Sequence, residues 1–130
     1  MVEILSEQEA SGRTLEVYDD IKSTFGMVPN FFKAQAAVDP DWMEQNWNRV
    51  KRIMVAERGL DRKTKEIIAL VVSLLNRCEY CSAAHEMMAR MAGADDEEIN
   101  EVKQVLELFV SFNSIADSLA VPLDDFLKKP

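Results

Sequence analysis

The sequence predicts an all-α fold in a single domain. Apolar residues recur at three- and four-residue steps through most of the 130-residue chain, which is the period of one helical face. Residues suited to helix N-termini precede several of these segments. No segments show the paired two-residue alternation of a β-hairpin, and there is no internal repeat or long linker. We therefore expect one helical bundle over residues 1–130, with residues 1–10 as a flexible N-terminal segment.

The first predicted helix covers about residues 11–25. Its apolar side chains lie three or four residues apart, as on one helical face: Leu15, Tyr18, Ile21 and Phe25. Gly26 can end this helix, because glycine adopts the left-handed conformation of helix C-termini at little cost. After a turn, Asn30 can cap a short helix that continues through Val38.

A longer amphipathic helix is predicted over about residues 40–57, with Pro40 in its first turn. Its apolar residues are spaced by four, three and four positions: Met43, Trp47, Val50 and Met54. Gly59 interrupts the pattern, and Asp61 can cap a following helix over residues 62–75. The β-branched run within that segment would also suit a buried strand, but its length and the capping residue favour a helix. Since this helix is apolar on every side, we expect it at the centre of the fold.

Two further helices are predicted from capping patterns. Asn76, followed three residues later by Glu79, resembles a capping box that would start a helix at Arg77, and Gly93 would end it. A second capping pattern, Asp95 with Glu98, precedes a long apolar stripe: Ile99, Val102, Leu106, Phe109, Phe112, Ile115, Ala116 and Leu119. Pro122 stops this last helical pattern.

Charge and hydropathy exclude several classes of partner. The net charge of −8 would repel phosphate backbones and anionic lipids, so we expect neither nucleic acid nor a membrane surface as a partner. The longest strongly apolar stretch, residues 67–75, is far shorter than the roughly 20 residues that span a bilayer. The first residues lack the pattern of a secretory signal, so we expect a cytoplasmic protein whose cysteines are thiols at rest.

The two cysteines of the chain lie three residues apart, and its one histidine follows four residues later. In a helix, Cys78, Cys81 and His85 would project from one stripe. A thiolate is the nucleophile in disulfide exchange and peroxide reduction, whereas an ordinary thiol has a pKa near about 8.5 and needs activation. The helix N-terminus would activate Cys78, whereas His85 as a base would activate Cys81.

Two other interpretations of this segment compete with redox chemistry. The same residues, continued by Met88 and Ala92, would form an ordinary buried helical seam. With a carboxylate, Cys78, Cys81 and His85 could also bind zinc. However, ligands from consecutive turns of one helix point along a line, and the chain has no second pair of Cys or His ligands. We therefore favour a redox site and expect no metal and no cofactor.

The segment from Glu66 to His85 has the pattern Glu, eleven residues, then Cys-x-x-Cys-x-x-x-His. It resembles the alkylhydroperoxidase AhpD-like group of the carboxymuconolactone decarboxylase family, in the peroxidase-related subgroup. The similarity extends to residues 26–32 and to Phe112-Asn113. The resemblance implies an all-helical fold that assembles into homo-trimers or hexamers. It also implies an antioxidant oxidoreductase that reduces alkyl hydroperoxides or disulfides and is regenerated by a dithiol reductant.

The resemblance also implies residue roles. Cys81 would attack the peroxide, Cys78 would resolve the resulting sulfenic acid to a disulfide, and His85 with Glu66 would form the proton relay. By spacing alone, Glu66 would be a surface acid paired with Arg62, and only the resemblance promotes it to the site.

One position departs from the family pattern, since Tyr80 stands where the best-known members have histidine. A phenol with a pKa near about 10 carries protons poorly at neutral pH, so the relay would be shorter or peroxide reduction weaker. Ser73, two turns after Glu66, could hydrogen-bond near the site, although bonding within its own helix is favoured. The alternatives are a decarboxylase-type enzyme of the same family, which needs no cysteine pair, and a non-catalytic structural protein with a Cys/His zinc site.

Overall fold

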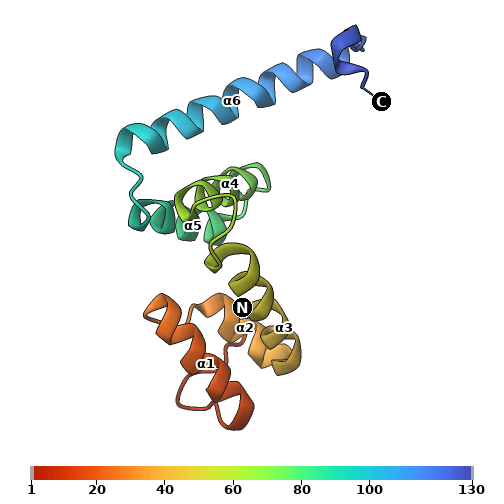
Figure 1. Ribbon diagram of the computed structural model, residues 1–130. Helices are drawn as coiled ribbons and strands as arrows, with labels where there is room; N and C mark the ends of the chain where they lie inside the picture. Colours follow the sequence, from red (N-terminus) through yellow and green to blue (C-terminus); the bar gives the residue numbers. More distant parts are fainter. Residues whose placement is uncertain (1, 130) are drawn as a thin grey trace. The chain divides into compact units, whose positions relative to one another are not determined.

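A computed structural model describes residues 2–129 of the chain, and every regular element among them is helical (Figure 1). The all-α prediction is therefore confirmed. Cα packing divides the chain into two compact units, Met1–Ala56 and Glu57–Pro130.

Three α-helices form the first unit: α1 (Gly12–Phe25), α2 (Asn30–Val38) and α3 (Pro40–Val50). These bounds agree with the predicted first and second helices, and Gly26 ends α1 with a left-handed φ of 82°. The core is mostly apolar: Ala10, Val17, Tyr18, Ile21, Val28, Phe32, Ala36, Met43 and Trp47. Trp47 lies at its centre, in edge-to-face contact with Phe25 and Phe32 at centroid distances of 5.2 and 5.5 Å.

The N-terminal segment contacts this unit through its backbone. The Leu5 N–H donates to the carbonyl of Lys33 at 3.0 Å, and the Tyr18 hydroxyl donates to the carbonyl of Leu5 at 2.8 Å. Ala10 is buried. Flexibility of residues 1–10 stays a prediction: motion of residues 5–10 would have to break these contacts, and Met1 lies outside the described residues.

The helix predicted over residues 40–57 continues past α3 with a different hydrogen-bond pattern. Its start is as expected, because Asp39 accepts from the backbone N–H groups of Asp41 and Trp42 and Pro40 occupies the first turn. Residues Lys51–Val55 then form a π-helical turn, η1, and Ala56 is extended. A π turn holds one residue more than an α turn, a difference that hydrophobic spacing does not reveal.

The second unit contains α4 (Arg62–Leu75), α5 (Glu79–Met91) and α6 (Asp96–Ser118). Both predicted Asp caps are present: Asp61 accepts from the Thr64 N–H at 2.8 Å, and Asp95 forms a complete capping box with Glu98. Helices α4 and α5 pack side by side. With the start of α6 they enclose a second core: Leu70, Ala89, Ala94 and Ile99, flanked by Ile67, Leu74 and Val102.

The start of α5 differs from the prediction. No capping box forms at Asn76; instead Asn76 ends α4, and Cys78 is the N-cap of α5. Arg77 takes a left-handed φ of 55°, which lets the Cys78 N–H donate to the Ser73 carbonyl at 3.0 Å. This is the hydrogen bond of a Schellman motif, with arginine where glycine is usual. It turns the chain sharply and delays α5 by two residues.

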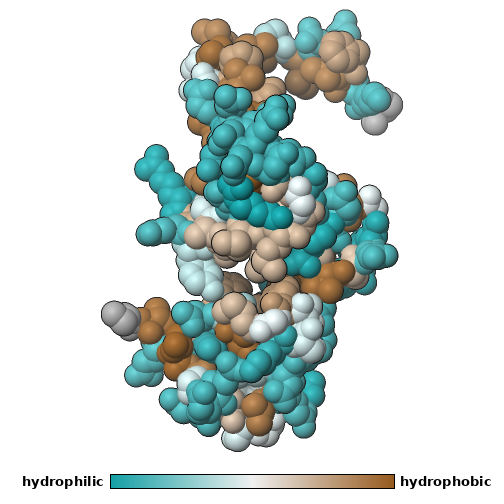
Figure 2. All heavy atoms as spheres, turned by 90° about the vertical axis from the view of Figure 1, so that its left-hand side faces the viewer, coloured by the Kyte–Doolittle hydropathy of each residue, from teal (hydrophilic) through white to brown (hydrophobic). Residues whose placement is uncertain are grey.

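Helix α6 packs on its own unit only near its beginning. Ile99 is fully buried, and Leu106 is partly buried. The other large apolar side chains from Val105 to Leu127 are exposed: Val105, Leu108, Phe109, Val110, Phe112, Ile115, Leu119, Val121, Leu123, Phe126 and Leu127. Hydrophobic atoms accordingly gather at the upper end of the space-filling view, where the C-terminal residues lie (Figure 2).

Helix α4 is not enclosed on every side, contrary to the prediction. Glu66, Leu70 and Ser73 are buried, whereas its opposite face is half exposed: Ile68, Val72 and Leu75. The prediction was wrong because a helix that is apolar on every side need not be covered on every side by the helices of its own unit.

Candidate active site

Glu66 is the buried acid of the second unit. It lies on α4 in line with Leu70 and Ser73, and only 1% of its surface is exposed. The Nε of Arg62 donates to its Oε1 at 2.9 Å, and the Nδ1 of His85 lies 2.8 Å from its Oε2. A buried carboxylate is costly unless it is paired and hydrogen-bonded, and here each oxygen has a partner.

His85 belongs to α5 and reaches Glu66 across the α4–α5 packing contact. Its side chain is 27% exposed, so the imidazole joins a buried acid to the protein surface. When a carboxylate accepts from Nδ1–H, the proton-accepting nitrogen of a neutral imidazole is Nε2. The pair can therefore present a base at Nε2.

Cys78 and Cys81 form a disulfide with their Cα atoms 5.3 Å apart. The structure thus holds the oxidised pair, whereas the sequence leads us to expect resting thiols. The Cys78 Sγ also accepts from the backbone N–H of Cys81 at 3.2 Å, which places Cys78 at the helix N-terminus. Cys81 is in the first turn of α5, one turn before His85, so it lies within reach of that helical face.

The two possible auxiliary residues, Tyr80 and Ser73, differ in their exposure. Tyr80 is half exposed, at 47%. Ser73 is buried, and its hydroxyl donates to the carbonyl of Ala69 at 2.6 Å, so this bond stays within α4.

The structure brings Glu66, His85 and Arg62 together. The sequence had indicated Arg62 only as a surface partner of Glu66. The signal for it was the i, i+4 spacing to an acid on an apolar helix.

Metal binding and membrane spanning find no support among the described residues. Over residues 2–129, no three His, Cys, Asp or Glu side chains cluster closely enough to hold a metal ion. In the disulfide form the two cysteines also offer no thiolate ligand. None of the helices in the described part of the chain is both long and apolar enough to cross a bilayer.

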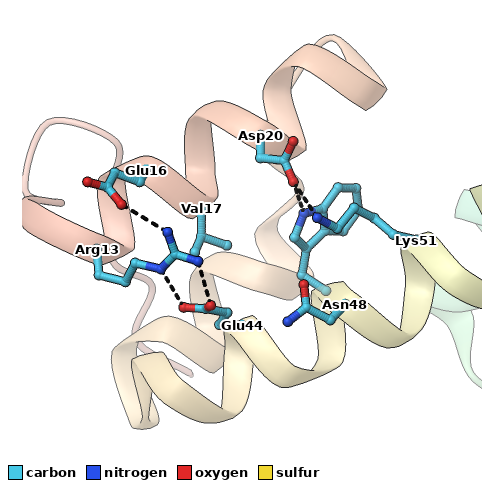
Figure 3. Close-up of a pocket in the computed structure, with 8 residues that line it drawn as sticks. Arg13, Glu16, Val17, Asp20, Glu44, Asn48 and Lys51 are labelled. Atoms are coloured by element: carbon cyan, nitrogen blue, oxygen red, sulfur yellow. Dashed lines mark hydrogen bonds and ion pairs between the residues drawn. The ribbon is translucent and has the colours of Figure 1, made fainter.

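A polar pocket of about 130 Å³ lies in the first unit, between α1 and α3 (Figure 3). Arg13 binds both carboxylate oxygens of Glu44, at 2.9 and 2.8 Å. Asp20 accepts from Trp47 and from Lys51, each at 2.8 Å, and these bonds, that of Lys51 first, lower the pKa of Asp20. Since these charged groups already pair with one another, we interpret the pocket as a polar contact that holds the helices together.

Residues 40–124 match the model of the carboxymuconolactone decarboxylase family. A crystal structure of the alkylhydroperoxidase AhpD core from Rhodospirillum rubrum has a TM-score of 0.92 and 32% identity to this chain, over 100% of this chain and 98% of that one. The alkyl hydroperoxide reductase AhpD of Bradyrhizobium diazoefficiens is 32% identical over 76 residues, which cover 58% of this chain and 38% of that protein.

A third relative is the uncharacterized protein 4 in cox locus of Paracoccus denitrificans, 30% identical over 69 residues, which cover 53% of this chain and 58% of that protein. The chain therefore spans less than two thirds of the length of these two curated relatives. The AhpD core structure, by contrast, is matched over nearly its whole length. With the family model matching more than half of its residues, the chain belongs to the carboxymuconolactone decarboxylase family, in its AhpD-like group.

Proposed function

We propose that this protein is a thiol-dependent alkyl hydroperoxide reductase. The observation that carries the proposal is the 2.8 Å contact between buried Glu66 and His85, one helical turn from a cysteine that is paired with a second cysteine. A base and an oxidisable dithiol are the two parts that such a reaction needs. The names of the AhpD relatives support the same activity.

The proposed reaction begins with the reduced pair. The Cys81 thiolate attacks one oxygen of the hydroperoxide, forming an S–O bond and breaking the O–O bond. The alcohol leaves with a proton, and Cys81 becomes a sulfenic acid. The Cys78 thiol then attacks the Cys81 sulfur, releasing water and forming the disulfide. An external dithiol returns the pair to the reduced form by two thiol–disulfide exchanges.

In this proposal the other residues move or hold protons. His85 takes the proton of the Cys81 thiol at Nε2 and returns it to the departing alkoxide. Glu66 orients the imidazole and stabilises its protonated form, as the buried carboxylate of a catalytic triad does. Cys78 attacks second, although its position at the helix N-terminus also favours its thiolate, which would assist resolution and reduction.

The family also contains decarboxylases, which are the main alternative enzyme class. Decarboxylation of a lactone proceeds by proton transfer, which Glu66 and His85 could perform without the cysteines. The disulfide between Cys78 and Cys81 favours the redox proposal, because a proton-transfer enzyme has no use for an oxidisable pair beside its base.

We also propose that the protein is a homo-oligomer and that the exposed stripe of α6, from Val105 to Leu119, packs against a second copy. These side chains continue the stripe that Ile99 begins in the core. A row of large apolar side chains of this length is typical of an association surface in a folded protein. The half-exposed face of α4 is a second apolar surface available to the same assembly.

Steady-state turnover tests the proposed activity. With the reduced protein, an alkyl hydroperoxide and dithiothreitol, we expect one alcohol formed per hydroperoxide consumed and one dithiothreitol oxidised. The double variant Cys78→Ser/Cys81→Ser is the control for uncatalysed reduction and should show the background rate. A wild-type rate equal to that background would rule the proposal out.

A further inference from the structure

We propose that Arg62 is a positioning residue for His85. Its positive charge keeps Glu66 ionised, and the ionised carboxylate selects the His85 tautomer that carries its proton on Nδ1. The tautomer depends only on the contacts within the Arg62–Glu66–His85 chain. Its consequence for catalysis rests on the proposed function. Arg62 acts on the imidazole through Glu66, to which both side chains are bonded.

The geometry divides the carboxylate of Glu66 between two partners. Arg62, one turn earlier on α4, donates from Nε to Oε1 at 2.9 Å, and His85 meets Oε2 at 2.8 Å. Glu66 is 1% exposed, whereas the Arg62 side chain is 35% exposed. The acid therefore has little access to water, and Arg62 connects it to a positive charge at the surface.

The charge state of this acid decides the direction of its bond with the imidazole. A carboxylate only accepts, so His85 must donate from Nδ1, and Nε2 is left as the proton acceptor. A neutral carboxylic acid, formed when Glu66 takes up a proton from solvent, can instead donate to Nδ1; the proton of the neutral imidazole then lies on Nε2, and that side no longer offers a base. A neighbouring cation favours the charged form of an acid, and burial favours the neutral form. The positive charge of Arg62 thus favours the ionised carboxylate of Glu66 against the effect of burial.

A second Arg–Glu pair in the same unit provides a matched control. Arg90 on α5 donates to Glu86 at 3.2 Å, again with i, i+4 spacing. The Arg90 side chain is 35% exposed, the same as that of Arg62. Glu86, however, is 30% exposed and also pairs with Lys103. Arg90 also binds Asp96 at 2.6 Å. Arg90→Gln therefore removes an equally exposed arginine, and neither of its two acids binds His85.

The test reads the tautomer directly by long-range ¹H–¹⁵N NMR. His85 is the only histidine of the chain, so in a tag-free, reduced protein every imidazole signal belongs to it. At a pH where the ring is neutral, we expect Nδ1–H in the wild type, in Arg62→Lys and in Arg90→Gln. Arg62→Gln should shift the population toward Nε2–H. An unchanged tautomer in folded Arg62→Gln would overturn the proposal.

Arg62→Lys keeps the test decisive if Arg62→Gln does not fold. Because this variant retains a positive charge one turn from Glu66, it must preserve Nδ1–H, and loss of that tautomer would overturn the proposal. For the reaction, Arg62→Gln should lower kcat by about 10- to 100-fold, the range for removing a group that orients a functional histidine, with KM little changed. A wild type without peroxidase activity would refute the proposed function but leave the tautomer test intact.

Discussion

Glu66 and His85 make a 2.8 Å contact although they lie 19 positions apart in the chain. The contact depends on the left-handed turn at Arg77, which folds α5 back along α4. The buried acid and the imidazole are thereby brought together by two adjacent helices.

Removing the base should alter the pH dependence of the reaction. We expect His85→Ala to slow peroxide consumption at neutral pH by about 100-fold or more, the usual contribution of a general base. The pH of half-maximal rate should rise, since thiolate would then form only as hydroxide replaces the imidazole as base. Stopped-flow rates between pH 5 and 10 measure both effects. Arg90→Gln should follow the wild-type curve, and an unchanged curve for His85→Ala would contradict the relay.

The two cysteines should differ when substituted singly. Cys81→Ser should abolish peroxide consumption, whereas Cys78→Ser should still consume one equivalent and stop as a sulfenic acid at Cys81. Intact-protein mass spectrometry after a sulfenic-acid trap distinguishes the two. If Cys81→Ser kept full single-turnover reactivity, the attacking thiol would be Cys78, activated by the helix N-terminus.

Tyr80 offers a gain-of-function test. Tyr80→His would restore the histidine that the best-known relatives have before the second cysteine, and it adds a group that titrates near neutral pH. If proton transfer limits the rate, peroxide reduction at pH 7 should become faster. Tyr80→Phe is the control, because it removes the hydroxyl without adding a base. Equal rates for Tyr80→His and the wild type would show that the relay is not limiting.

Arg77 should be replaceable by glycine with a gain in stability. The left-handed conformation destabilises a residue other than glycine by roughly 1–2 kcal/mol. Glycine removes this strain, but part of the gain is lost because glycine has more conformational freedom in the unfolded state. We therefore expect Arg77→Gly to raise the free energy of unfolding by about 0.5–1 kcal/mol. Arg77→Ala, which keeps the unfavourable φ of 55°, should give no gain. Denaturation with urea measures the difference, and a less stable Arg77→Gly would be the contrary result.

Association should depend on the exposed stripe of α6. A charge at its centre, Phe109→Glu, should weaken association by at least about 2 kcal/mol, as at interface hot spots. Gln104→Glu adds the same charge to an exposed polar position of the helix and should leave association unchanged. Sedimentation equilibrium provides the measurement. A wild type that is monomeric throughout the micromolar range would refute the oligomer.

Local signals in the sequence were sufficient to predict most helix boundaries. The Asp61 and Asp95 caps and the end of α1 at Gly26 follow from neighbouring residues, and the structure agrees. The predicted start of α5 was wrong because Asn76 and Glu79 also fit a capping box. Only the backbone hydrogen bond from Cys78 to Ser73 in the Schellman turn distinguishes a start at Arg77 from the observed later start. Whether Lys51–Val55 is α- or π-helical is likewise set by backbone bonds, not by apolar spacing.

The candidate site needed more than local patterns. The spacing of Cys78, Cys81 and His85 marked a redox segment, but nothing in it pointed to a partner 19 positions earlier. Glu66 was placed there only by family resemblance, and Arg62 was taken for an ordinary surface ion pair. Burial decides both points: an acid that is 1% exposed requires partners, and sequence patterns do not report which acid is buried.

The central claim is that the cysteine pair reduces a hydroperoxide, and counting thiols after a single equivalent tests it most directly. Reduced wild-type protein is mixed with one equivalent of cumene hydroperoxide, and free thiols are titrated under denaturing conditions. We predict that both thiols are lost within the assay time, with a Cys78–Cys81 disulfide in the peptide map and one equivalent of alcohol. Two thiols remaining, with the hydroperoxide unconsumed, would contradict the account.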